Sequence, residues 1–157
     1  MLALSLDYVN RIMKLNIRQA QRVDFGEVFG LLQQLWANSK LDYDLLLGVY
    51  NKAIDSEVQK LIIGELDKKI IGFCSLTIKN SLWQAGNLGH IDELIIDKEY
   101  RNIGFGKEMM DSITIIAKEL NCRRIELDSA FHRKEAHEFY VALGYENRAY
   151  LFSKSLI

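Results

Sequence analysis

Six consecutive residues combine two glycines with a fixed positive charge: Arg101-Asn102-Ile103-Gly104-Phe105-Gly106. They join a predicted strand, His90 to Ile96, to a predicted helix that runs to about Leu120. Glycine lets the backbone turn tightly and approach a ligand without an intervening Cβ. The new helix points unpaired N–H groups and its positive dipole end at the same place. The spacing predicts a phosphate-binding turn, and the alternative is a plain connection between a strand and a helix.

Two adjacent carboxylates, Asp92 and Glu93, stand in the apolar strand before this turn. Strand alternation places Glu93 on one face with Ile91 and Ile95, and Asp92 on the opposite face. A carboxylate inside such a strand is costly unless it is used or paired, and burial raises its pKa toward neutrality, where it can serve as a general base. Glu93 is the first candidate base, and its alternative is a salt bridge to a helix at the end of the sheet. Asp92 is the second candidate, particularly if a bulge changes the local register.

Three pieces of the chain, in this order, resemble the GCN5-related N-acetyltransferase (GNAT) superfamily: Asp92-Glu93-Leu94, residues 101–106, and Ala136-His137-Glu138-Phe139-Tyr140 through Gly144-Tyr145. The superfamily motif is Arg/Gln-x-x-Gly-x-Gly/Ala after a strand, and residues 101–106 match it at every defined position. The resemblance extends from about Ile17 to Ser155 and is nearest in appearance to the small-molecule branch, such as aminoalkylphosphonate acetyltransferases. It implies an enzyme that transfers the acetyl group of acetyl-CoA directly to a primary amine of a small molecule.

The same resemblance implies which residues hold the cofactor. The turn binds the pyrophosphate of acetyl-CoA, and the strand backbone near Leu94 and Ile95 supplies donors to the acetyl carbonyl oxygen. The residues assigned to the cofactor in this way are Leu94, Ile95, Ile96, Arg101, Asn102, Ile103, Gly104, Phe105, Gly106, Lys107 and Arg133. At Arg133 the chain departs from the superfamily, which commonly has an asparagine there that contacts the pantetheine arm. A guanidinium at that position could instead hold a phosphate, phosphonate or carboxylate group of the cofactor or the substrate.

Tyr140 is the candidate general acid, because a tyrosine at this place in the superfamily often protonates the departing CoA thiolate. The alternative is that Tyr140 belongs to the apolar stripe of its helix and serves packing. His90 and His137 have the pKa of a base, but a lone histidine is more often structural. Cys74 and Cys122 lack the spacing of a zinc site, so no metal is predicted.

Strands and helices must place these residues. The expected strands are Leu15 to Gln19, Lys60 to Leu66, Ile70 to Ile78, Gly89 to Ile96, Arg124 to Asp128 and Ala149 to Ser155. The expected helices run from Phe25, capped by Asp24, to about Asn38, from Leu41 to about Asn51, from the glycine turn to about Leu120, and from Ala136 to Leu143, with Gly144 as the C-cap. A polar turn, Asp67-Lys68-Lys69, joins the second and third strands, and a loop over Asn80 to Asn87 joins the third and fourth.

This order of elements predicts an α/β (α+β) fold. An early hairpin, followed by strands that alternate with helices, is typical of a mixed, mostly antiparallel central sheet flanked by about four helices. We expect a single domain over residues 1–157, with residues 1–14 as an N-terminal extension.

Length, composition and charge limit the function classes. The chain has 157 residues and a net charge of −1, and the lack of a basic surplus argues against nucleic-acid binding. Neither an apolar run of about 18 residues nor a signal peptide is visible, so we expect no membrane partner and a cytoplasmic protein. A homodimer through the N-terminal extension and the tail, Ala149 to Ile157, is one expectation for the assembly. Two other functions stay open: acetylation of a protein or peptide, and CoA binding without catalysis.

Overall fold

The computed structural model describes residues 13–157, so the expected N-terminal extension lies outside the described residues except for Met13 and Lys14. The described chain divides into two compact units, one that ends at Glu126 and one that spans Leu127–Ile157. None of the described helices is long and apolar enough to cross a membrane.

Five strands form the sheet of the first unit, in the order β1-β2-β3-β4-β5. Their bounds are β1 Asn16–Gln19, β2 Gln59–Leu66, β3 Lys69–Ser81, β4 Gly86–Ile96 and β5 Cys122–Leu127. The pairs β1/β2, β2/β3 and β3/β4 are all antiparallel. The mostly antiparallel sheet predicted from the sequence is therefore confirmed.

Two hairpins connect β2, β3 and β4. Asp67 and Lys68 form the first turn with φ angles of 49° and 67°, a left-handed pair that suits the twist of a two-residue hairpin loop. The second hairpin differs from the prediction, because β3 and β4 stay paired out to Ser81 and Gly86. The predicted loop over residues 80–87 shrinks to residues 82–85, since polar side chains on an exposed ribbon do not interrupt the backbone ladder.

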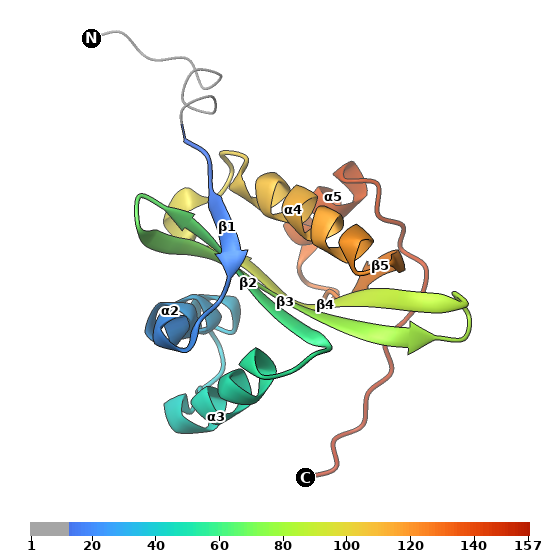
Figure 1. Ribbon diagram of the computed structural model, residues 1–157, viewed down its shortest axis with the longest axis horizontal. Helices are drawn as coiled ribbons and strands as arrows, with labels where there is room; N and C mark the ends of the chain where they lie inside the picture. Colours follow the sequence, from blue (N-terminus) through green and yellow to red (C-terminus); the bar gives the residue numbers. More distant parts are fainter. Residues whose placement is uncertain (1–12) are drawn as a thin grey trace, which may run out of the picture. The chain divides into compact units, whose positions relative to one another are not determined.

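Helices cover both faces of this sheet (Figure 1). On one face α2, Phe25–Leu35, and α3, Tyr43–Ile54, pack on β3 and β2. Their shared core is made of Ala20, Phe25, Val28, Leu31, Leu32, Tyr50, Ala53, Leu61, Ile63, Ile70, Phe73 and Ile95. On the other face α4, Phe105–Glu119, buries Met109, whose Sδ would lie 2.7 Å from a Cβ at Gly64. Glycine on β2 thus lets α4 approach the sheet closely.

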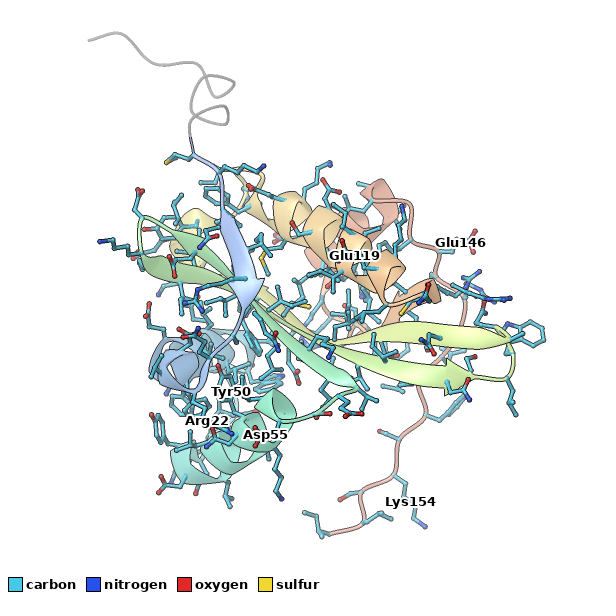
Figure 2. All side chains as sticks on the ribbon, in the orientation of Figure 1. Arg22, Tyr50, Asp55, Glu119, Glu146 and Lys154 are labelled. Carbon is cyan, nitrogen blue, oxygen red and sulfur yellow. The ribbon has the colours of Figure 1, made fainter. Side chains whose placement is uncertain are left out.

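Contacts near the C-terminal end of α3 tie it to the residues just before α2. The buried Tyr50 hydroxyl donates to the backbone oxygen of Gln21 at 2.7 Å, and burial raises the pKa of Tyr50 to about 12. On the surface, Arg22 of the short helix η1, Arg22–Asp24, pairs with Asp55 at 2.6 Å (Figure 2). These bonds fix the end of α3 against η1 and the residue before it.

Asp24 is buried and is the N-cap residue of α2 as predicted, but its side chain makes no capping bond to that helix. Its two carboxylate oxygens accept from Nη1 and Nη2 of Arg18 at 2.8 and 2.9 Å, and the backbone N–H of Gln21 donates to Oδ2 at 2.7 Å. Glu65 on β2 completes the ion pair group, 3.1 Å from Arg18. A guanidinium offers two charge-assisted bonds in a matching geometry, which outweigh a single bond to a helix N–H.

The second unit contains α5, Lys134–Ala142, and an extended tail. Gly144 has a φ of 86°, so the predicted C-cap is confirmed. The predicted last strand, Ala149 to Ser155, is wrong, because residues 145–157 form no strand. This segment was expected to close the fold, yet Phe152 is 91% exposed and the ring of Tyr150 lies tilted beside that of Phe131, with 6.3 Å between the ring centroids. With α5 the described helices number four, as expected for the α/β (α+β) class.

Candidate active site

A bulge in β4 lies at the two candidate bases. In the β3/β4 ladder Glu93 pairs with Ser75 and Ile91 pairs with Leu76, which leaves Asp92 as the extra residue. Residues directly opposite each other in an antiparallel pair share a face of the sheet. Glu93 and Ile91 therefore lie on opposite faces, and the prediction that they share one is wrong. The bulge considered for Asp92 is present, because regular alternation ends at that residue.

Two hydroxyl groups of β3 bind the two carboxylates. Ser75 donates through Oγ to the carboxylate of Glu93, and its Oγ accepts from the backbone N–H of Glu93 at 3.1 Å. Thr77, two residues further on the same face, donates to the carboxylate of Asp92. His90 Nδ1 lies 2.9 Å from Oδ1 of Asp92. We call these five residues, Ser75, Thr77, His90, Asp92 and Glu93, the bulge cluster.

The bulge cluster lies on the sheet face that α2 and α3 cover. Phe73 precedes Ser75 by two residues and Ile95 follows Glu93 by two, and both belong to the core beneath these helices. Because residues two apart in a strand share a face, the apolar core residues and the polar cluster lie on the same face of β3 and β4. On that face Asp92 is exposed and Glu93 is half-buried.

The two carboxylates of the cluster have opposite pKa shifts. Burial raises the pKa of Glu93, and the negative charge of Asp92 adds to the rise, while the bond from Ser75 and the charge of His90 oppose it. Burial also acts on Asp92, but its bonds with His90 and Thr77 outweigh burial, so its pKa falls. Among residues 13–157 no lysine or arginine forms a salt bridge with Glu93. The salt bridge to a helix that was considered as the alternative role of Glu93 is therefore absent from these residues. Glu93 is the better proton acceptor near neutral pH.

The glycine turn that follows β4 has the backbone of an anion site. Asn102 and Gly104 have φ angles of 62° and 103°, and Gly104 is the N-cap of α4. The first helical bond runs from Glu108 N–H to Gly104 O, so the N–H groups of the preceding turn have no acceptor within the helix. A Cβ at Gly104 would meet no atom within 4 Å, which shows open space before the helix. This turn fits a phosphate group of a CoA cofactor.

The side chains of the turn have other partners. Phe105 is buried, with its ring 6.5 Å from that of Tyr100. Lys107 Nζ pairs with Asp111 at 2.6 Å. Arg101 donates through Nε to the backbone oxygen of Ile96 at 2.8 Å, which holds its guanidinium beside the turn. Phe105 and Lys107 can therefore contribute backbone N–H groups rather than side chains to a bound anion.

The remaining predicted strand residues also serve packing. Ile95 and Ile96 are buried, and Leu94 is half-buried and opposite Cys74 of β3. Ile95 and Ile96 can therefore offer a ligand only their backbone groups. Ile103 lines a second cavity of about 260 Å³ at the start of α4, together with Met13, Gly104, Phe105, Lys107, Glu108 and Asp111.

Arg133 and Tyr140 both belong to the second unit. Arg133 is half-buried at the N-cap of α5. Tyr140 is half-buried between the rings of Phe139 and Tyr145, with centroids 5.3 and 5.9 Å away. The Tyr145 N–H also donates to the backbone oxygen of Tyr140 at 3.0 Å. These contacts hold the phenol ring in place within its unit.

Ser75 and Thr77 belong to the candidate site, because they bind its two carboxylates, and the sequence prediction missed them. The sequence did contain a signal for them, since these two hydroxyl residues alternate within the apolar part of β3, residues 70–78. No group of three or more histidine, cysteine or acidic residues suited to a metal ion occurs in the described part of the chain. His137, at 3.1 Å from the backbone oxygen of Ala130, has a structural contact.

Residues 21–145 match the acetyltransferase (GNAT) family, and the chain belongs to it. It is 26% identical over 141 residues to an aminoalkylphosphonate N-acetyltransferase of Salmonella typhimurium, covering 89% of this chain and 90% of the relative. It is 27% identical over 145 residues to a glucosamine 6-phosphate N-acetyltransferase of Arabidopsis thaliana, covering 92% and 95%. The fold matches an aminoglycoside N-acetyltransferase solved in complex with CoA, with a TM-score of 0.81, 18% identity and coverage of 92% and 97%.

These findings establish the reaction class. The chain is an N-acetyltransferase of a family that uses acetyl-CoA as the donor. The resemblance inferred from residues 92–94, the glycine turn and the last helix is confirmed.

Proposed function

We propose that this enzyme acetylates the primary amine of a small molecule by direct transfer from acetyl-CoA. The observation that carries the proposal is Glu93, a half-buried carboxylate with a raised pKa and no lysine or arginine salt bridge among the described residues, on the strand that leads into the glycine turn. An alkylamine is mostly protonated at neutral pH, with a pKa near about 10, so its acetylation needs a base. Glu93 meets that need.

Acetyl-CoA, when bound, supplies an acetyl group activated as a thioester. The backbone N–H groups of residues 104–107 would hold its pyrophosphate, and Arg101 would add positive charge beside them. The backbone of Leu94 and Ile95 would donate hydrogen bonds to the acetyl oxygen, as the family resemblance implies. The buried side chains of β4 keep that backbone rigid, so the donors are pre-organised.

Glu93 would remove the proton from the ammonium group of the acceptor, directly or through a water molecule. Ser75 positions the carboxylate by donating to it and by accepting from the Glu93 backbone. Asp92 is the second candidate base, but its lowered pKa makes it a weaker proton acceptor. The bond with His90 instead stabilises the negative charge of Asp92, so a second carboxylate charge lies beside Glu93 in the cluster.

Tyr140 would give its phenol proton to the departing thiolate. Its fixed ring supports that role, because a donor must be held in one orientation to act within hydrogen-bond reach. Arg133 would hold an anionic group of the cofactor or acceptor through its guanidinium. Replacing Arg133 with alanine would test this through a selective rise in KM for the anionic ligand, and unchanged KM values would contradict it.

The names of two relatives support a proposal for the acceptor class. The two curated relatives are named for an aminoalkylphosphonate and for glucosamine 6-phosphate, each a small primary amine with a phosphorus oxyanion. We propose an acceptor with both features. We further propose that residues 1–157 form a single domain, that the protein is cytoplasmic, and that it forms a homodimer.

A thiol-release assay with acetyl-CoA tests the proposed function. The panel would contain aminoalkylphosphonates, amino sugars, polyamines, amino acids and peptides, with Glu93→Gln and Tyr140→Phe as variants. We expect turnover on a small amine that both variants lose. Turnover on peptides alone would favour a protein or peptide acceptor, and tight CoA binding without any turnover would favour a non-catalytic role.

A further inference from the structure

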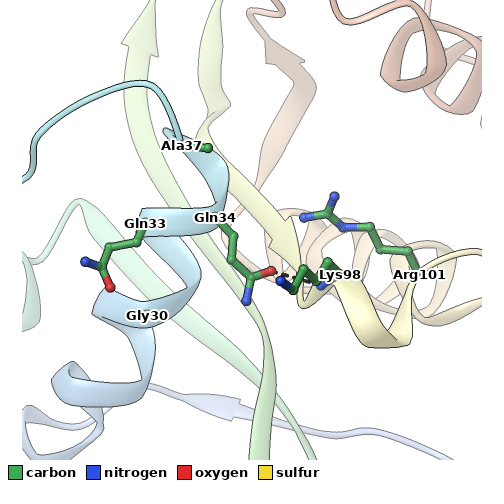
Figure 3. A pocket seen from close by; sticks show the side chains of 6 residues that line it. All are labelled: Gly30, Gln33, Gln34, Ala37, Lys98 and Arg101. Carbon is green, nitrogen blue, oxygen red and sulfur yellow. Dashed lines mark hydrogen bonds between the residues drawn. The ribbon is translucent and has the colours of Figure 1, made fainter.

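A cavity of about 410 Å³ lies between the end of α2 and the short helix η2, Lys98–Tyr100. Its lining residues are Gly30, Gln33, Gln34, Ala37, Lys98 and Arg101. Two of the six are cations and none is acidic, and none belongs to the bulge cluster. In Figure 3 Lys98 and Arg101 face Gln34 and Ala37 across the cavity.

Both cations lack a carboxylate partner within residues 13–157. The acids on either side of Lys98 are directed elsewhere, since Asp97 and Glu99 each lie 3.9 Å from Nζ of Lys69. The Nε of Arg101 is held by the oxygen of Ile96, which leaves the terminal N–H groups of the guanidinium to line the cavity. Two like charges beside one cavity repel each other, so an anion there is stabilising.

Gln34 adds a neutral donor to these charges. Its Oε1 accepts from the backbone N–H of Lys98 at 2.9 Å, a bond that also fixes η2 against α2. Because the carbonyl end of the side chain is used, the amide N–H groups are the end that can donate to a ligand. A Cβ at Gly30 would meet no atom within 4 Å, so the helix side of the cavity is open.

We propose that this cavity binds a phosphoryl oxyanion, either a phosphate or a phosphonate group, in addition to the one expected at the start of α4. A guanidinium, an ammonium and an amide together match the charge and the several acceptor oxygens of such a group. Only the source of the anion rests on the proposed function. It is either the 3′-phosphate of acetyl-CoA or the phosphorus group of the acceptor.

Two variants of the full chain test the cavity, each with a matched control. Lys98→Gln removes a cation at similar length, and Lys118→Gln removes one from the far end of α4. Gly30→Glu places a carboxylate in the cavity, and Gly26→Glu places one elsewhere on α2, where a Cβ also meets no atom within 4 Å. Methylphosphonate binding, followed by NMR titration, is expected to weaken about tenfold in both cavity variants and to stay unchanged in both controls.

The source of the anion follows from two further comparisons in the same four variants. If the anion is the 3′-phosphate, Lys98→Gln abolishes the preference for CoA over 3′-dephospho-CoA in calorimetric titrations. If it belongs to the acceptor, that preference stays, and KM rises about tenfold for an aminoalkylphosphonate but not for the alkylamine of equal length.

Equal methylphosphonate affinity in the wild type and both cavity variants would overturn the proposal. That titration requires no turnover, so it separates failure of the cavity site from failure of the proposed acetyl transfer.

Discussion

Asp24 and Glu93 are both carboxylates at least partly removed from solvent in the same unit, and their surroundings shift their pKa values in opposite directions. Asp24 accepts two bonds from Arg18 and one from a backbone N–H, and the bonds from Arg18 lower its pKa. Glu93 accepts from the hydroxyl of Ser75, no guanidinium among the described residues pairs with it, and burial raises its pKa. A full set of partners makes a carboxylate inert, while an incomplete set leaves it basic. The difference predicts that Asp24 serves stability and Glu93 serves chemistry.

Replacing Glu93 with glutamine gives the largest expected effect. We expect kcat/KM to fall by roughly 10²- to 10⁴-fold, the usual contribution of a general base. The thermal midpoint should stay the same or rise at pH 7. The folded pKa of Glu93 lies above its unfolded value, so the ionised carboxylate lowers stability as the pH rises between these two values, and glutamine carries no such cost.

The measurement is a pH profile of kcat/KM with a thermal melt of the same sample. Glu119→Gln, at the exposed end of α4, is the control and should behave as the wild type. Activity of a folded Glu93→Gln variant within about threefold of the wild type would give the role of base to another group.

Replacing Asp24 with asparagine is expected to lower stability and to leave kcat unchanged, the opposite of Glu93→Gln. Breaking a buried ion pair from one side is expected to cost about 3 kcal/mol, which lowers the melting temperature by roughly 6–12 °C. The folded protein should keep its kcat. Because Arg18 lowers the folded pKa of Asp24, the advantage of the wild type is fully present above the unfolded pKa, near about 4, and is lost as the pH falls through the folded pKa.

Denaturant melts of Asp24→Asn and Asp55→Asn between pH 3 and pH 7 check this prediction. Asp55 also pairs with an arginine, at 2.6 Å, but both partners are exposed, so its loss should change stability little. Equal losses in the two variants would show that burial of Asp24 adds nothing to its ion pair.

The sequence predicted features that depend on local contacts. The turn at Asp67 and Lys68 and the helix start at Gly104 are set by neighbouring residues, and both are confirmed. The loop over residues 80–87 and the strand over 149–155 depend on whether a partner strand is available, which one chain segment does not reveal. Both predictions were wrong for that reason.

The candidate site shows the same limit. Glu93 is partly buried and has a raised pKa, as expected, but its face was predicted wrongly, because the bulge exists only in the pairing of β4 with β3. Its role as the base stays a prediction. The role of Ser75 could not be found without that register. Likewise the side chain of Asp24 was expected to cap a helix. It pairs with Arg18 instead, because the turn after β1 brings these two residues together, and the sequence does not show that turn. The roles given to Tyr140 and Arg133 stay predictions.

Replacing Ser75 with alanine should make the Glu93 environment still poorer in partners. The hydroxyl lowers the pKa of Glu93, so its loss raises that pKa further. We expect the acid limb of the kcat/KM profile to move to higher pH. At the acidic pH values of that limb kcat/KM should fall by about three- to tenfold, while the plateau at higher pH should change little.

Profiles of Ser75→Ala and of Ser112→Ala, a half-buried serine on α4, provide the comparison. A uniform loss at every pH would mean that Ser75 supports the fold rather than the carboxylate.

Replacing Asp92 with asparagine gives the smallest expected effect and one of opposite sign. The negative charge of Asp92 raises the pKa of Glu93, so its removal lowers that pKa and moves the acid limb to lower pH. Asparagine keeps an oxygen that can accept from Thr77, so the plateau should change by less than about threefold. Asp44→Asn, at the exposed start of α3, controls for the loss of one charge.

If Asp92 were the base, Asp92→Asn would lose activity as completely as Glu93→Gln, and kcat/KM would fall at every pH rather than shift its acid limb. The direction of the shift therefore separates the two carboxylates, since only a neighbour of the base moves the limb to lower pH while leaving the plateau in place.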